Sequence, residues 1–93
     1  MKTLLFAAPV LLAVATPALA QVMTPDEYVA AAGASDLYER QSSQIVLQTT
    51  QDPKIKSFAT MMIADHGKST AEVKAAAARS GVAAPPPTLM PLT

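Results

Sequence analysis

The chain has 93 residues, which allows one small domain. Seven Lys and Arg residues balance seven Asp and Glu residues, so no excess of positive charge favours binding to nucleic acid or anionic lipid. The sequence contains no Cys, which excludes a disulfide framework, a thiolate zinc site, an iron–sulfur cluster and a lipid-modified N-terminal Cys. Hydrophobic residues make up 51% of the chain, so disorder throughout is not expected.

The N-terminal residues have the three parts of an export signal. Lys2 supplies the positive charge, residues 4–15 form an apolar run, and residues 18–20 have the A-x-A pattern of a cleavage site. The apolar run is too short to span a bilayer, which needs about 20 residues. We therefore predict a signal peptide over residues 1–20, cleaved after Ala20, and a mature protein that is periplasmic or secreted.

The mature chain begins with a strong helix start. Thr24 can cap the helix, Pro25 suits the first helical position, and Glu27 completes a capping box. The helical pattern continues to about residue 50, so we predict a first helix over residues 25–50.

One stripe along this first helix is expected to turn toward the second helix, although it carries few large side chains. The stripe consists of Tyr28, Ala31, Ser35, Tyr38, Ser42, Ile45, Val46 and Thr49. Val29 and Leu47 lie on the opposite side, so the helix is expected to have more than one neighbour.

A second helix start follows after a short turn. Asp52 can cap the helix and Pro53 fits its first position, while Gly81 marks the end, so we predict a helix over residues 53–80. This helix is clearly amphipathic. Its apolar stripe consists of Ile55, Phe58, Ala59, Met62, His66, Ser69, Val73, Ala76 and Ala77. The residues after Gly81 are rich in proline and cannot continue the helix.

The fold class predicted from these segments is all-α. The short turn makes the two helices antiparallel neighbours, so residues 21–84 should form a two-helix hairpin, followed by a proline-rich tail or linker over residues 85–93. Two amphipathic helices of this size bury only one side of each, which is marginal for stability. We therefore expect self-association of hairpins into four helices, or a missing C-terminal half that completes the bundle.

Three residues are weak candidates for a metal or small-ligand site. His66, the only histidine, falls within the apolar stripe, Asp65 lies at its edge, and Glu39 lies at the edge of the first helix's stripe. Di-iron bundles use a Glu-x-x-His motif, but Ile63 stands three residues before His66. We therefore predict no metal site and no cofactor, and assign His66 to a polar partner on the facing helix, such as Glu39.

No residue carries a pattern typical of catalysis. The serines on the helices have no glycine-rich elbow around them, and a single histidine would have to serve as any base. Met61 and Met62 could suggest a soft metal, but adjacent helix positions cannot converge on one ion, so packing is the better interpretation. We predict no catalytic residue.

Several segments of the two helices are similar to one known family. The matching residues are Tyr28, Tyr38-Glu39, Gln41-Ser42-Ser43, Asp52 to Ala59, and Met62-Ile63-Ala64-Asp65-His66, the last being the most specific. Over about residues 24–87 the sequence resembles the bacterial domain of unknown function 4142 family, whose exported members are often described as outer-membrane proteins. The resemblance implies a ferritin-like antiparallel helical bundle in the periplasm or envelope, and implies no activity.

Members of that family usually continue beyond the proline-containing loop into two further helices, whereas this sequence ends at Thr93. The resemblance therefore implies half of a ferritin-like four-helix bundle. The function we expect is that of an exported, non-enzymatic bundle protein of the envelope with a structural or stress-related role. Two alternatives are a bundle that binds a metal or small ligand, and an amphipathic hairpin that docks on a membrane or on partner helices, although the charge balance does not support membrane association.

Overall fold

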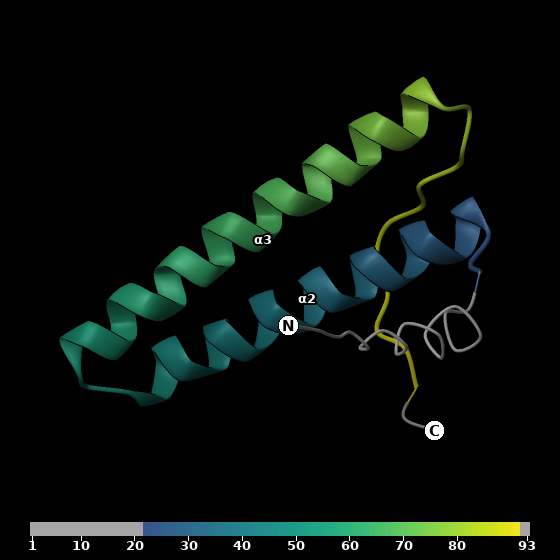
Figure 1. Ribbon diagram of the computed structural model, residues 1–93. Helices are drawn as coiled ribbons and strands as arrows, with labels where there is room; N and C mark the ends of the chain where they lie inside the picture. The colour runs from purple at the N-terminus through teal and green to yellow at the C-terminus, as the bar shows by residue number, and fades with distance from the viewer. Residues whose placement is uncertain (1–21, 92–93) are drawn as a thin grey trace, which may run out of the picture.

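The computed structural model describes residues 22–91 and contains two helices, α2 (Pro25–Thr49) and α3 (Pro53–Arg79), which lie side by side as an antiparallel hairpin (Figure 1). The predicted all-α hairpin is confirmed, and residues 22–91 include no strand. The predicted signal peptide, residues 1–20, lies outside the described residues. Neither helix of the described region is long and apolar enough to cross a membrane.

Both helices begin where local capping signals predict. The side chain of Thr24 accepts a hydrogen bond from the Glu27 backbone N–H at 3.1 Å, and Glu27 Oε1 accepts one from the Thr24 N–H at 2.8 Å. This reciprocal pair is the predicted capping box. At α3, Asp52 Oδ1 accepts from the Lys54 N–H at 2.8 Å. Each cap stabilises its helix by about 1 kcal/mol.

The end of α3 is fixed by a glycine in a left-handed conformation. Gly81 has a φ of 71°, which a side chain would make unfavourable. Its N–H donates to the Ala78 carbonyl at 3.3 Å, and the Val82 N–H donates to the Ala77 carbonyl at 2.9 Å. This pair of bonds is the Schellman arrangement, and it turns the chain away from the helix axis.

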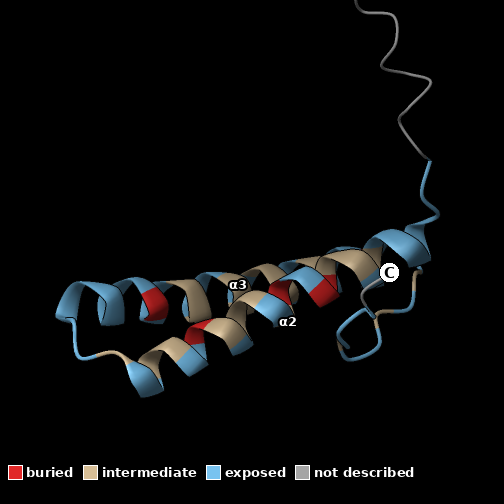
Figure 2. Ribbon diagram, turned by 90° about the horizontal axis from the view of Figure 1, so that it is seen from below, coloured by how far each residue is buried: buried red, intermediate tan, exposed pale blue. Residues whose placement is uncertain are grey.

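The interface between α2 and α3 is built from small and polar residues (Figure 2). The buried residues of the two helices are Gly33, Ala34, Asp36, Ser43, Ala59 and Ala77. No large side chain among the described residues is fully buried. The helices can therefore approach closely, but their contact removes little apolar surface from water.

The prediction that this stripe of α2 faces α3 is wrong for its largest side chains. Tyr28, Tyr38 and Ile45 are each about 60% exposed, whereas Val29 and Leu47, expected on the outer side, are half-buried. The two sides of α2 carry similar numbers of apolar residues, so periodicity did not distinguish them. The side of α2 that faces α3 carries the small residues Gly33, Ala34 and Ser43 and the carboxylate of Asp36.

The apolar stripe predicted for α3 faces α2 along its centre, as predicted, but its edge is exposed. Ala59 and Ala77 are buried, and Met62, His66, Ser69 and Val73 are half-buried. Ile55, Phe58 and Ala76 belong to the predicted stripe but remain exposed. A single neighbouring helix covers only the middle of so wide a stripe.

After α3 the proline-rich segment, residues 82–91, turns back and runs across α2 (Figures 1 and 2). It is not helical, as predicted, but it is not a free tail. A Cβ placed on Gly33 would lie 3.2 Å from Cβ of Pro87, so the absence of a side chain at Gly33 allows this close approach. The segment therefore covers one side of the hairpin near its open end.

Candidate functional site

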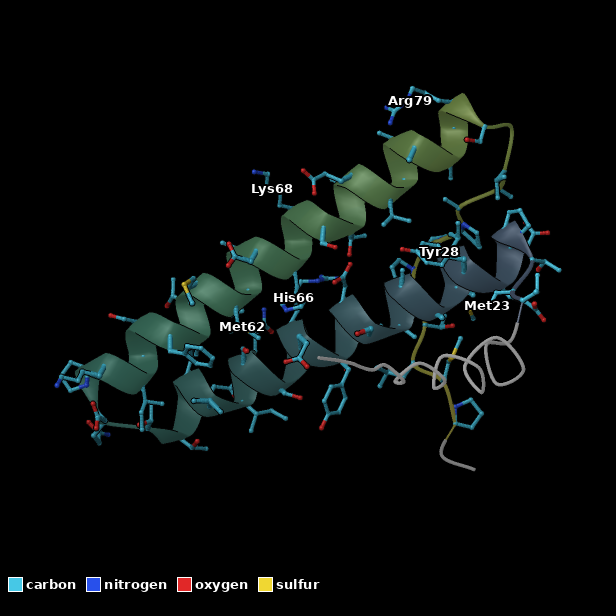
Figure 3. The ribbon with its side chains drawn as sticks, viewed as in Figure 1. Met23, Tyr28, Met62, His66, Lys68 and Arg79 are labelled. Atoms are coloured by element: carbon cyan, nitrogen blue, oxygen red, sulfur yellow. The ribbon has the colours of Figure 1, made fainter. Side chains whose placement is uncertain are left out.

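The most organised group of polar side chains is the Asp36–His66 bridge at the middle of the hairpin. His66 extends from α3 toward α2, whereas Lys68 and Arg79 project from the outer surface of α3 (Figure 3). Nδ1 of His66 lies 2.8 Å from Oδ1 of Asp36. An ionised carboxylate can only accept, so the Nδ1–H group of His66 donates this bond.

The second carboxylate oxygen of Asp36 is also satisfied. The hydroxyl of Thr70 lies 3.1 Å from Oδ2 and 3.1 Å from the backbone carbonyl of His66, one turn earlier on α3. Asp36 is only 5% exposed, so these donors replace the water that burial removes. The bridge therefore joins the two helices through a carboxylate that accepts a hydrogen bond at each oxygen.

The pKa of Asp36 reflects this balance. Burial alone would raise the pKa, but hydrogen bonding by His66, Ser69 and Thr70, together with the charge of His66, lowers it below its ordinary value. Asp36 is thus ionised at neutral pH.

The prediction that His66 meets a polar partner on the facing helix is confirmed, but that partner is Asp36 and not Glu39. Glu39 is half-buried and Asp65 is exposed, while the bond to His66 comes from Asp36. Within residues 22–91, no three His, Cys, Asp or Glu side chains come close enough to hold a metal ion, so Glu39, Asp65 and His66 do not form such a group.

A signal for Asp36 was present in the sequence. At about 100° per residue, Asp36 lies within about 20° of both Val29 and Leu47. These two residues were recognised as a separate side of α2, and a carboxylate between two apolar residues suggests a buried partner. A stripe drawn on the opposite side, through Tyr38 and Ile45, leaves Asp36 facing away from α3.

The bridge has the chemistry of a structural contact. Nucleophilic catalysis needs a hydroxyl or thiol within hydrogen-bond reach of the imidazole nitrogen that accepts its proton. The nearby Thr70 hydroxyl is instead directed at Asp36 and at a backbone carbonyl. The bonds of the Asp36–His66 bridge link α2 to α3 and orient the His66 ring.

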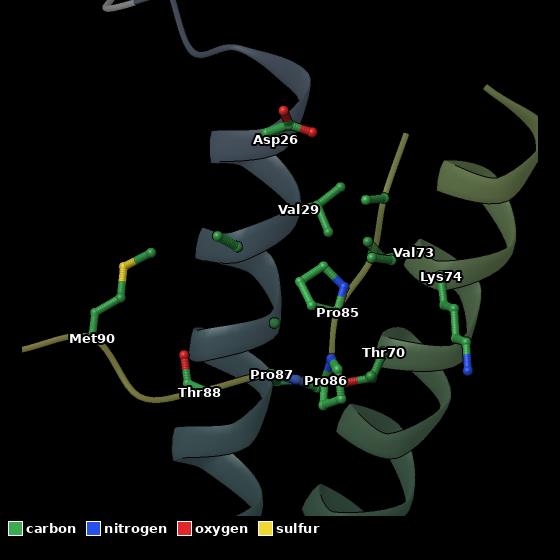
Figure 4. A pocket seen from close by; sticks show the side chains of 14 residues that line it. Asp26, Val29, Thr70, Val73, Lys74, Pro85, Pro86, Pro87, Thr88 and Met90 are labelled. Atoms are coloured by element: carbon green, nitrogen blue, oxygen red, sulfur yellow. The ribbon is translucent and has the colours of Figure 1, made fainter. Parts of the chain in front are cut away.

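A cavity of about 540 Å³ lies between the hairpin and the proline-rich segment (Figure 4). Val29 and Gly33 of α2 and Val73 of α3 line one wall, and Pro85 to Pro87 line the other. Asp26, Thr70 and Lys74 add polar groups. The segment thus covers this side of the hairpin without filling it.

The other side of the hairpin carries an apolar face that no described segment covers. We define the apolar face as Val46 of α2 with Phe58, Met61 and Met62 of α3. Phe58 is 57% exposed and Met61 is 49% exposed, whereas Tyr38 and Ile45 lie on the side of α2 that points away from α3. At about 100° per residue, Val46 and Phe58 are each rotated by about 80° from the Asp36–His66 contact, toward the same side of the antiparallel pair.

The sequence was also compared with known proteins. The sequence model of a family described as Domain of unknown function (DUF4142) matches residues 8–91. No curated protein matches the chain, and no solved structure matches it.

Proposed function

The chain belongs to the DUF4142 family, and on this premise we propose that it is a non-enzymatic helical-bundle protein of the bacterial envelope that binds other helices through its apolar face. The N-terminal pattern of charge, apolar run and A-x-A site supports export. A structural or stress-related role fits a protein that exposes an apolar face and whose polar bridge joins its two helices.

The observation that carries this proposal is the imbalance between buried and exposed apolar side chains. The buried hydrophobic residues are Ala34, Ala59 and Ala77, all of them small. A fully buried Phe or Met stabilises a fold by roughly 1.5–3 kcal/mol, yet Phe58 and Met61 are about half exposed. Most of the stability of a helix in a protein comes from packing its apolar side, and this packing is lost where the apolar side stays in water. Covering the apolar face would supply the missing stabilisation.

Three methionines provide a test of whether that face is covered. Met61 is 49% exposed, close to the 48% of Met23 and the 52% of Met90, which lie outside the apolar face. The full coding sequence is expressed with its own N-terminal segment, and the protein is recovered from the periplasmic fraction. Limiting peroxide then oxidises the methionines, and mass spectrometry measures the oxidation rate of each one. Each rate is divided by the rate of the same methionine in urea-unfolded protein.

We expect Met61 to be oxidised several-fold more slowly than Met23 and Met90. Equal normalised rates for the three methionines would show an uncovered face and would contradict the proposal. A parallel sample with liposomes separates the membrane alternative, because protection of Met61 only when liposomes are present would indicate docking on lipid instead of on helices.

A further inference from the structure

We infer that the partner of the apolar face is a second copy of this chain, bound antiparallel about a two-fold axis to give a four-helix bundle. The inference rests on the proposed function, since it names what covers the same face. The axis passes between Phe58 and Met62 of each copy, so that the two apolar faces meet.

The position of the proline-rich segment favours a closed pair. This segment covers the side of the hairpin that carries Gly33, opposite to the apolar face. The apolar face is therefore on the flank of the described hairpin that this segment leaves open. A single self-complementary face forms a two-fold dimer, whereas two different faces would allow an open chain of subunits.

The size of the face fits a dimer of modest affinity. From the axis to Pro53, α3 extends by about seven residues, so antiparallel hairpins overlap over about 21 Å at 1.5 Å per residue. Two helices about 10 Å apart present a side about 20 Å wide, which gives roughly 420 Å² per copy. This area is below the range of stable specific interfaces, so the dimer should be weak and should dissociate on dilution.

Charge favours the antiparallel arrangement. Lys54 lies one turn before Phe58, and Asp65 lies about two turns after Phe58, both exposed on the same side of α3 as the apolar face. Antiparallel pairing about the proposed axis brings Asp65 against the partner's Lys54, twice in each dimer.

The first experiment measures mass against concentration for the periplasmic protein. Light scattering after gel filtration should show a dimer that dissociates on dilution. Phe58→Glu should weaken the dimer at least about tenfold, because it places a charge at the centre of the interface. Ala64→Glu is the matched control, since Ala64 is exposed on the outer surface of α3 and should leave the affinity unchanged. A monomer at every concentration, or equal effects of the two variants, would overturn the inference.

A charge exchange then tests the orientation. Lys54→Glu and Asp65→Lys should each weaken the dimer by about twofold to fivefold, the range of exposed ion pairs, and the double variant should recover most of the loss. Failure of the double variant to recover would refute the antiparallel arrangement. Both side chains are exposed, so the monomer fold does not depend on them.

Oxidation of Met61 separates failure of this inference from failure of the proposed function. Protection that disappears on dilution together with the dimer supports the inference. Protection of Met61 in a protein of monomeric mass would mean that a different segment or partner covers the face, so the second copy would be wrong and the proposed function would stand. No protection at any concentration would refute both.

Discussion

Removal of the Asp36–His66 bridge should destabilise the protein without any metal being involved. In His66→Ala, Oδ1 of Asp36 loses the donor that lies 2.8 Å away, and the carboxylate is only 5% exposed. A hydrogen bond to a charged group contributes about 1.5–3 kcal/mol to stability. The His66 side chain is 27% exposed, so water can partly replace it, and we expect a loss of about 2 kcal/mol.

The Asp36→Ala variant removes the acceptor of two bonds, but Thr70 keeps its bond to the His66 carbonyl at 3.1 Å. We therefore expect a loss of about 2–3 kcal/mol. The double variant should cost little more than Asp36→Ala, because the interaction is already lost. The effect of the double variant should therefore differ from the sum of the two single effects by at least about 1 kcal/mol, whereas independent sites would give an additive effect.

Thermal unfolding followed by circular dichroism measures these differences. A loss of 2 kcal/mol corresponds to a fall in Tm of about 8–16 °C for a domain of this size. All variants are compared at one chain concentration, with and without a chelator. Lys68→Ala, on the outer surface of α3, is the control and should change stability by less than about 0.5 kcal/mol. A loss for His66→Ala that appears only in metal-loaded protein, or additive single effects, would refute this account of the bridge.

Further predictions concern the acid range, the proline-rich segment, the helix end and export. Because the pKa of Asp36 is lowered in the folded protein, its contribution to stability should be complete above about pH 4 and should be lost as the pH falls through the lowered pKa. Measurements of unfolding stability against pH should show this loss for the natural chain and not for Asp36→Asn. In Gly33→Leu the new side chain meets Pro87, so proteolysis of residues 82–91 should become several-fold faster while the helix content measured by circular dichroism stays unchanged. Gly81→Ala should cost about 1–2 kcal/mol in thermal unfolding because φ is positive there. Mass spectrometry of envelope fractions should find an N-terminus at Gln21, and retention of the leader would contradict this.

The ends of the helices could be predicted from the sequence because their signals are local. Thr24 with Glu27, and Asp52 at the next start, contact the backbone two or three residues away. Gly81 acts through its own φ angle. None of these contacts depends on where the rest of the chain lies, so the helices α2 and α3 end within about one residue of the predicted positions.

The side of α2 that faces α3 could not be predicted in the same way. Helix α2 has Tyr38 and Ile45 on one side and Val29 and Leu47 on the other, so its apolar pattern has no single direction. The choice depends on Asp36, whose burial makes sense only when His66 is opposite it, thirty residues later. It is a property of the pair of helices and not of α2 alone.

The docking of the proline-rich segment is non-local for the same reason. Prolines at 85–87 exclude a helix, which the sequence shows, but they do not identify the surface on which the segment lies. That surface is created by Gly33, which lies more than fifty residues earlier and has no side chain to obstruct Pro87.

The small residues along the α2–α3 interface give the Asp36–His66 bridge a role in alignment. Alanine, glycine and serine side chains interlock weakly, so two such helices could slide past one another by a full turn at little cost in packing. A slide toward the turn would set Asp36 opposite Met62, which offers no donor, and a slide the other way would retain Thr70 but lose His66. Either shift leaves a buried carboxylate short of a hydrogen bond, so the bridge selects one register among several that packing alone would accept.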